Sequence, residues 1–259
     1  MKRELPRIEL SGVGLHAITE AQCVDHVVRE LNEGRGGWIV TPNLDHMRRL
    51  TTDAAYRDLC SHADVLVADG MPLLWASRVQ RTPLPERVAG SSLISTLTAG
   101  LARRGGGRVF LLGGDGETAA EAARVLARRH PEIVVCGLES PRIGAEVDDA
   151  TRERLGRRLR WSRPDLVFVA LGSPKQEKLI QALRREYDAA WMVGVGISFS
   201  FLAGRVRRAP PWMQRLGLEW VHRLSQEPRR LARRYLVDGI PFAVRLLVSS
   251  ARRAQSRPS

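Results

Sequence analysis

Short apolar runs alternate with longer amphipathic stretches along the first two hundred residues. Six apolar runs predict strands, at Trp38–Thr41, Val65–Ala68, Arg108–Leu112, Ile133–Gly137, Leu166–Leu171 and Trp191–Val195. Runs such as DLVFVALG lack polar alternation, which is typical of parallel strands buried on both faces. Helical patterns lie between them, at roughly 45–60, 72–80, 91–104, 117–129, 146–161 and 174–186. This alternation predicts an α/β fold with a doubly wound, mainly parallel sheet.

The pattern changes after Val195. Leu216, Trp220 and Leu224 recur at helical spacing within residues 205–236, although several prolines interrupt that stretch. We therefore predict a core over residues 1–202 and a helical, basic appendage over residues 203–259. The last residues, RRAQSRPS, are predicted to be disordered.

The charge is concentrated in the predicted appendage. The chain carries a net charge of +13, and residues 203–259 hold 13 Arg, no Lys and 3 acids, which leaves +3 for the preceding 202 residues. This asymmetry favours an anionic partner, either nucleic acid, anionic lipid or a phosphorylated substrate. A solvated Arg-rich surface is the alternative.

Cysteine usage and hydropathy indicate the compartment. Three scattered cysteines form no C-x-x-C pair, which argues against disulfides and zinc and favours a reducing cytosol. The N-terminus has no signal-peptide pattern. No apolar run is long enough to span a bilayer, since the nearest candidate, Val237–Val248, is interrupted by charged residues and a proline. The sequence thus predicts a cytoplasmic protein whose membrane contact is peripheral.

Ligands in such folds bind at the carboxyl ends of the strands, where several polar residues follow the predicted strands. Thr41 and Asn43 could hydrogen-bond a nucleotide or sugar, or Asn43 could simply cap the next helix. Asp69 could be a general base for a sugar hydroxyl, or only a helix N-cap. Arg87 precedes a Gly-Ser-Ser helix start that favours anions. Gln176 lies in a first helical turn, where we expect it to contact a ligand.

The same first turn carries Lys175, which is expected to face the crevice with Gln176; for Lys175 and Lys178 a solvated helix surface is the alternative. In the appendage, Arg223, Arg230 and Arg233 would share one helical face if the helix continued through Pro228. Such a trio could clamp phosphates. Alternatively, the helix packs on the core with its charged face in water.

A glycine-rich loop supports a rival enzyme class. Gly114, Gly116 and Ala119 fit G-x-G-x-x-A between a strand and a helix, and Glu139 lies 23 residues beyond Gly116. This resembles the fingerprint of an NAD-dependent oxidoreductase. The motif is weakly specific, because Gly114, Gly116 and Glu117 could equally serve as a phosphate loop for another nucleotide.

Several signatures of metal and covalent chemistry are absent. The chain has no D-x-D, H-E-x-x-H, G-x-S-x-G or G-x-x-x-x-G-K-[ST] motif, and its six histidines form no ligand-spaced cluster. We therefore expect no catalytic metal, no cofactor and no covalent Ser or Cys nucleophile.

Taken together, the motifs resemble the WecG/TagA/CpsF family, also called glycosyltransferase family 26. The similar segments are colinear over residues 10–240: TPN at 41–43, ADGMPLLWASR at 68–78, ERVAGSSL at 86–93, FLLGGDGETA at 110–119, LGSPKQEKLI at 171–180, GVGISFSFLAGRVRRAPPWMQRLGLEWVHRL at 194–224 and QEPRRLARRYL at 226–236.

The resemblance implies a Rossmann-like α/β core and an inverting, metal-independent transfer from a UDP-sugar, typically UDP-N-acetylmannosamine or its uronic acid. It implies an undecaprenyl-diphosphate-linked acceptor and an appendage that closes the site at the anionic inner membrane surface. The products of such enzymes enter cell-surface polysaccharides and teichoic acids. Nucleic acid is not an expected partner, and homo-oligomer formation is left open.

By the same resemblance, Asp69 matches the general base, and Thr41 and Asn43 lie near donor and acceptor. Arg87 and Gln176 match pocket residues, and the three appendage arginines match residues that reach the diphosphate. One departure concerns Ser200, which stands where the family usually has Asp. Since this change removes a charge, the identity of the sugar and the local folding there are left open.

Overall fold

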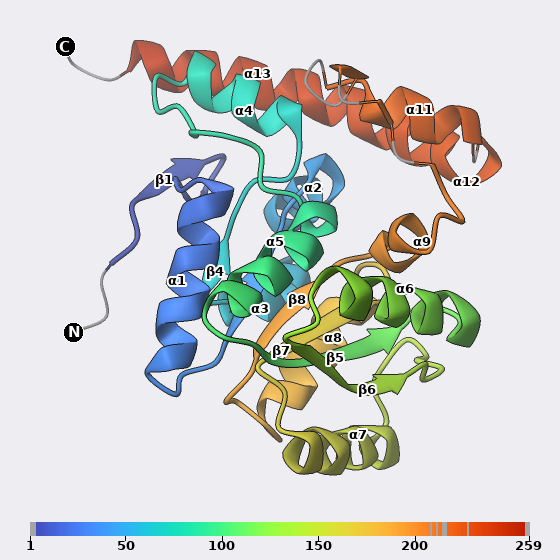
Figure 1. The fold of residues 1–259 in the computed structure, drawn as a ribbon. Helices are drawn as coiled ribbons and strands as arrows, with labels where there is room; N and C mark the ends of the chain where they lie inside the picture. The colour runs from blue at the N-terminus through green and yellow to red at the C-terminus, as the bar shows by residue number, and fades with distance from the viewer. Residues whose placement is uncertain (1–3, 208, 211, 214–216, 227, 257–259) are drawn as a thin grey trace.

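The computed structural model describes residues 4–207, 209–210, 212–213, 217–226 and 228–256. At its centre lies a six-stranded sheet, ordered β4-β3-β8-β7-β5-β6, in which every neighbouring pair is parallel (Figure 1). The strands are β3 Gly37–Val40, β4 Val65–Leu66, β5 Gly107–Gly113, β6 Ile133–Glu139, β7 Leu166–Ala170 and β8 Trp191–Gly194. All six predicted strands are present, although β4 is shorter than predicted.

The apolar runs are buried on both faces of the sheet because neighbouring side chains point to opposite sides. Trp38 and Phe110 belong to one apolar cluster, whereas the adjacent Ile39 and Val109 belong to the other. Continuous hydrophobicity is therefore what these strands require. The doubly wound, Rossmann-like α/β fold is confirmed.

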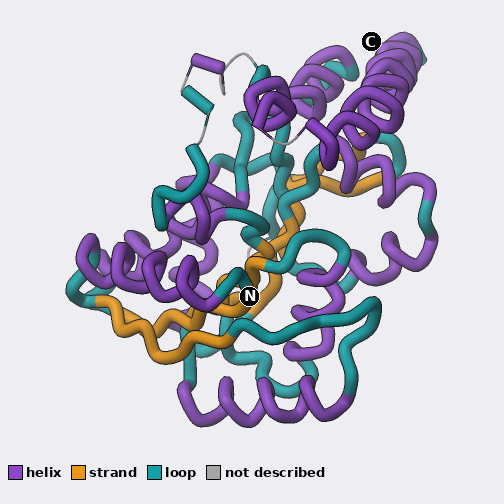
Figure 2. The backbone as a smooth tube through the Cα atoms, turned by 90° about the vertical axis from the view of Figure 1, so that its right-hand side faces the viewer, coloured by secondary structure: helices purple, strands orange, loops and turns teal. Residues whose placement is uncertain are grey.

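Helices cover both faces of the sheet, as the two views show (Figures 1 and 2). One face is covered by α1 Glu20–Asn32, α5 Gly90–Arg103 and α6 Gly116–Arg129. The other is covered by α2 Leu44–Thr52, α3 Ala54–Ser61, α7 Asp149–Ser162 and α8 Lys175–Arg184. The single helix predicted over 45–60 is wrong. Asp53 has extended backbone angles, and its side chain accepts a hydrogen bond from the backbone of Tyr56, so α2 ends there and α3 begins.

The sequence patterns gave no prediction for the N-terminal segment. It forms an antiparallel hairpin of β1 Arg7–Leu10 and β2 Val13–His16, followed by α1. Ser11 and Gly12 both have positive φ, as a tight two-residue hairpin turn requires. Thr19 and Gln22 form a capping box at the start of α1.

The C-terminal part consists of several helices, which are α9 Ser198–Leu202, α11 Glu219–Gln226, α12 Pro228–Ala232, the π-helix η1 Arg233–Gly239 and α13 Ile240–Gln255. Of these, α11, α12 and α13 lie along one edge of the molecule, whereas α9 lies beside α6 (Figure 1). The family departure at Ser200 lies within α9, so a helix forms there.

Helix α13 packs against α4 Met71–Val79. Its Phe242 and Leu246 join the apolar cluster that also contains Leu73 of α4. Residues 252–255, within the stretch predicted to be disordered, belong to α13. Residues 257–259 lie outside the described part of the chain. The division at residue 202 stays a prediction.

Candidate active site

The carboxyl ends of β3 and β4 bring Thr41 and Asp69 to the same edge of the sheet. Thr41 follows β3 and is buried. The backbone N–H of Asp69 donates to the carbonyl oxygen of Pro42 at 2.8 Å, so the two strand ends are tied together. This is the edge at which ligands bind in open α/β sheets.

Asp69 is part of a three-residue charged group. Nη1 of Arg87 lies 3.8 Å from Oδ1 of Asp69 and donates a 2.7 Å hydrogen bond to Oε2 of Glu219. All three side chains are partly exposed, at 20–27%. The N-cap interpretation of Asp69 is wrong, because Gly70 occupies that position of α4 and no side chain caps it. Sequence reasoning missed Glu219, since a contact across 132 residues leaves no local pattern.

Asn43 is a helix cap. Its Oδ1 accepts hydrogen bonds from the backbone N–H groups of Asp45 and His46, at 3.0 and 3.1 Å. The backbone N–H of Asn43 in turn donates to Nδ1 of His46 at 3.3 Å, which completes a capping box. The capping interpretation is therefore confirmed, and a contact of Asn43 with substrate stays a prediction.

Close backbone packing brings Thr41 and Gln176 into one cluster. A Cβ atom on Gly90, the first residue of α5, would lie 2.8 Å from the carbonyl oxygen of Gly194 and 3.2 Å from Oγ1 of Thr41. A Cβ on Gly194 would lie 2.5 Å from Nε2 of Gln176. Only glycine permits these approaches. The strand ends thus gather Thr41, Gly90, Gly194 and Gln176.

Side chains in the first turn of α8 form hydrogen bonds within the protein. Oε1 of Gln176 accepts from the backbone N–H of Gly196 at 3.2 Å, and Nε2 donates to Glu177 at 3.0 Å. Lys175 is exposed and Lys178 is partly exposed, and both also contact the protein. Their ammonium groups donate to the carbonyl oxygens of Ile143 and Ala145, at 2.7 and 2.9 Å, and so hold the loop before α7.

Arg223 belongs to α11, Arg230 to α12 and Arg233 to η1, and residue 227 between α11 and α12 lies outside the described part of the chain. That the three arginines share one helix face stays a prediction. Arg223 lies one turn after Glu219 on α11, and its Nε is buried without a hydrogen-bond partner among the described residues. Arg233 is exposed in η1. The side chain of Arg230 lies outside the described part of the chain.

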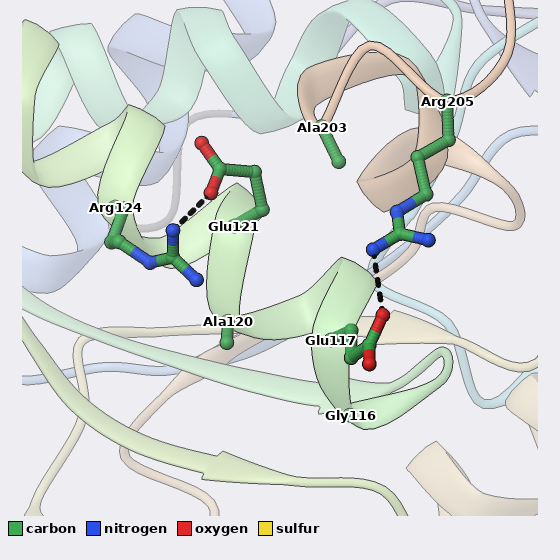
Figure 3. Close-up of a pocket in the computed structure, with 7 residues that line it drawn as sticks. All are labelled: Gly116, Glu117, Ala120, Glu121, Arg124, Ala203 and Arg205. Carbon is green, nitrogen blue, oxygen red and sulfur yellow. Dashed lines mark hydrogen bonds and ion pairs between the residues drawn. The ribbon is translucent and has the colours of Figure 1, made fainter.

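The glycine-rich loop borders an open pocket of about 610 Å³ between α6 and the end of α9. Figure 3 shows its lining residues, which are Gly116, Glu117, Ala120, Glu121, Arg124, Ala203 and Arg205. Two ion pairs occupy it: Arg205 with Glu117, at 2.9 Å, and Arg124 with Glu121. The pocket does not include Asp69 or the residues clustered around it.

The contacts of Asp115 and Glu139 do not suit a bound dinucleotide. Asp115 caps α6 by accepting from Oγ1 and the backbone N–H of Thr118, and these hydrogen bonds hold the pKa of Asp115 below its usual range. Its negative charge at the helix N-terminus opposes a diphosphate there. Glu139 pairs with Arg154 and Arg158, at 2.8 and 3.3 Å. These contacts disfavour the oxidoreductase interpretation, and a phosphate-binding role for Gly114, Gly116 and Glu117 stays a prediction.

Two features are absent from the described residues. No group of three or more His, Cys, Asp or Glu side chains within them could hold a metal ion. No helix within them is long and apolar enough to cross a membrane.

Comparison with known proteins gives a consistent result. A sequence model of the glycosyl transferase WecG/TagA/CpsF family matches residues 8–256. The chain is 30% identical over 229 residues to an N-acetylglucosaminyldiphosphoundecaprenol N-acetyl-beta-D-mannosaminyltransferase of Staphylococcus aureus strain MW2, covering 88% of this chain and 87% of the relative. It is 33% identical over 198 residues to a Bacillus subtilis protein of the same name, covering 76% and 75% of the two chains.

Proposed function

This chain belongs to the WecG/TagA/CpsF family and is a glycosyltransferase, and we propose that it transfers an N-acetylmannosamine-type sugar from a UDP-sugar to a polyprenyl-diphosphate-linked acceptor. The names of the Staphylococcus aureus and Bacillus subtilis relatives support the sugar and the acceptor. The transfer inverts the anomeric configuration and needs no metal.

One observation carries the mechanism. A partly buried carboxylate, Asp69, stands at the carboxyl edge of the sheet beside the guanidinium of Arg87. A carboxylate that is accessible to substrate and lies close to an anion-binding cation suits a reaction that needs a base and a stabilised diphosphate. Thr41 and Gln176, which lie close together at the carboxyl edge of the sheet, supply polar groups for orienting the sugar.

In the proposed reaction Asp69 accepts the proton of the acceptor hydroxyl. The hydroxyl oxygen forms a bond to the anomeric carbon while the bond from that carbon to the diphosphate oxygen breaks. The electron pair of the broken bond leaves with UDP. Attack from the face opposite the diphosphate gives inversion, and no covalent enzyme intermediate is formed.

Guanidinium groups would stabilise the charge that develops on the leaving diphosphate. Arg87 is placed beside the proposed base, and Arg223 has a buried N–H without a partner among the described residues. A buried donor of this kind is costly unless an anion satisfies it. Arginine also matches phosphate geometry with two parallel hydrogen bonds. This supports α11 as the element that meets the diphosphate, with Arg230 and Arg233 as further candidates.

The proposed acceptor carries a lipid, and η1 and α13 have features that suit a membrane surface. Val237, Ile240, Val244 and Val248 are exposed at helical spacing, on the side opposite the buried Phe242. Exposed arginines accompany them at positions 245, 252 and 253. An exposed apolar face with flanking basic residues favours peripheral binding to anionic lipid.

Calorimetry with purified protein tests the proposal first. UDP should bind in the presence of EDTA, and Arg87→Ala should weaken that binding about tenfold or more, whereas NADH should not bind. Turnover is then followed with UDP-N-acetylmannosamine and a polyprenyl-diphosphate N-acetylglucosamine acceptor, again in EDTA. NADH binding without UDP binding would overturn the proposal and would instead favour an oxidoreductase that uses the glycine-rich loop.

A further inference from the structure

Glu177 is a buried carboxylate that the proposed mechanism does not use. It lies in the first turn of α8 and is only 3% exposed. Its Oε1 accepts a hydrogen bond from Nε2 of Gln176, but its Oε2 has no hydrogen-bond partner among the described residues. Burying a carboxylate with an unsatisfied oxygen is costly. Stability alone therefore gives no reason for a carboxylate at this position.

Two groups that interact with Glu177, the Cys60 thiol and the Tyr56 hydroxyl, carry no positive charge. Burial, and then the Glu177 carboxylate, raise the pKa of Cys60 to about 12 and also raise the pKa of Tyr56. Both groups are therefore protonated and uncharged at neutral pH. The hydroxyl of Tyr56 is hydrogen-bonded to Oγ of Ser173 at 3.1 Å. Neither side chain supplies a positive charge to the carboxylate.

The bond to Glu177 fixes the orientation of the Gln176 amide. With Nε2 donating to Glu177 and Oε1 accepting from Gly196, each end of the amide faces its complement. A flipped amide would set its oxygen against the carboxylate and its NH₂ against the N–H of Gly196. A glutamine amide has two N–H donors and two lone pairs, so one of each remains for a ligand.

We propose that Glu177 is a positioning residue that locks the amide of Gln176 in the orientation required to bind the sugar donor. The proposal rests on the proposed function, in which Gln176 contacts the substrate. The Gln176 amide has little room to move, because its Nε2 also packs against Gly194, where an added Cβ would lie 2.5 Å from it. Misplacing a substrate-binding group by a fraction of an ångström lowers turnover without unfolding the protein.

The test compares Glu177→Met with Glu177→Gln, Gln176→Ala and the double variant. Glu177→Met keeps the volume but removes the acceptor, and kcat/KM should fall about tenfold. The Tm should not fall, since an apolar replacement of a buried charge is often neutral or stabilising. Glu177→Gln retains an acceptor oxygen and should recover most of the activity. In the Gln176→Ala background Glu177→Met should cost less than twofold, because the residue acts through Gln176.

A matched control is Glu30→Met. Glu30 of helix α1 is equally buried, but its Oε2 lies 2.6 Å from Nε of Arg35. Because Arg35 is 38% exposed, Glu30→Met leaves no buried charge unpaired, so the Tm should change little and kcat/KM per folded molecule should stay within twofold. Additive losses in the double variant, or a lower Tm with unchanged kcat/KM in Glu177→Met, would make Glu177 structural only.

A second readout does not depend on activity. In the wild-type protein, NMR of the Gln176 side-chain amide should show one Nε2 proton that exchanges slowly, and Glu177→Met should remove that protection. If the wild-type enzyme transfers no sugar but the protection behaves in this way, the proposed function fails while the orientation of Gln176 by Glu177 stands. Equal exchange of both protons in the wild-type protein would overturn the inference itself.

Discussion

Nη1 of Arg87 donates a 2.7 Å hydrogen bond to Oε2 of Glu219, although 132 residues separate the two in the sequence. Arg87 precedes α5, whereas Glu219 begins α11. Both side chains are about 20% exposed, so solvent screens their interaction less than it screens a surface pair. Through this contact, the position of α11 is coupled to the guanidinium that lies beside Asp69.

Glu219→Ala should therefore lower kcat/KM about tenfold. Loss of the carboxylate frees Arg87 to move toward Asp69, and it releases α11, which also carries Arg223. Steady-state kinetics at saturating acceptor would measure the change. Glu9→Ala is the control, since Glu9 pairs with Arg253 of α13 at 2.8 Å on an exposed surface. Its kcat/KM should stay within twofold, and an equal loss in both variants would contradict a specific role for Glu219.

Asp69→Asn should reduce turnover by roughly 10²–10⁴, the usual contribution of a general base. The affinity for UDP should change little, because the amide is isosteric and the donor nucleotide does not need the base. Single-turnover kinetics and calorimetry measure the two effects separately. Asp149→Asn, at a highly exposed position on α7, serves as the control. Near-normal turnover in Asp69→Asn would assign the base elsewhere.

The sheet and its strand-end residues could be predicted from the sequence because they depend on local pattern. A buried parallel strand is continuously apolar, and the first polar residue after it marks the carboxyl edge. That rule alone places Thr41 and Asp69 correctly. The hairpin at Ser11 and Gly12 and the capping box at Thr19 also have local sequence signals.

The remaining parts depend on tertiary contacts. Glu219 reaches Arg87 only because α11 packs near the strand ends, and Glu177 is buried only because α3 and α8 adjoin. The pairing of Glu139 with Arg154 and Arg158 likewise appears only in three dimensions. A fingerprint that includes Glu139 therefore misleads, since the sequence cannot show that this carboxylate is already paired.

Gly194→Ala should disturb Gln176 directly. Its Cβ would lie 2.5 Å from Nε2 and 2.7 Å from Cδ of that side chain, so the amide must shift. We expect kcat/KM to fall at least tenfold while circular dichroism stays unchanged. Gly116→Ala is the matched glycine control, because a Cβ there meets nothing within 4 Å and φ is ordinary. A large loss in Gly116→Ala would instead indicate that a phosphate approaches the start of α6.

His16 should make the stability of the fold depend on pH. It links the N-terminal hairpin to β4, since its Nδ1 accepts from the backbone N–H of Leu66 at 2.9 Å. Burial, and then Arg7, lower the pKa of His16 from 6.5 to about 4. The unfolded chain therefore takes up a proton at a higher pH than the folded chain does. The resulting stability is complete above about pH 6.5 and is lost as the pH falls toward 4, by at most about 3 kcal/mol.

The variant His16→Gln keeps an acceptor for Leu66 but does not titrate. Carboxylates also protonate in this range, but they do so in both proteins, and the difference between them isolates His16. Urea unfolding at half-unit steps from pH 7.5 to 4 should show the wild-type advantage shrinking between pH 6.5 and 4. A difference in unfolding free energy that stays constant across this window would mean that His16 is protonated equally in the folded and unfolded chains. The hairpin would then be fastened to β4 by its apolar contacts rather than by a neutral imidazole.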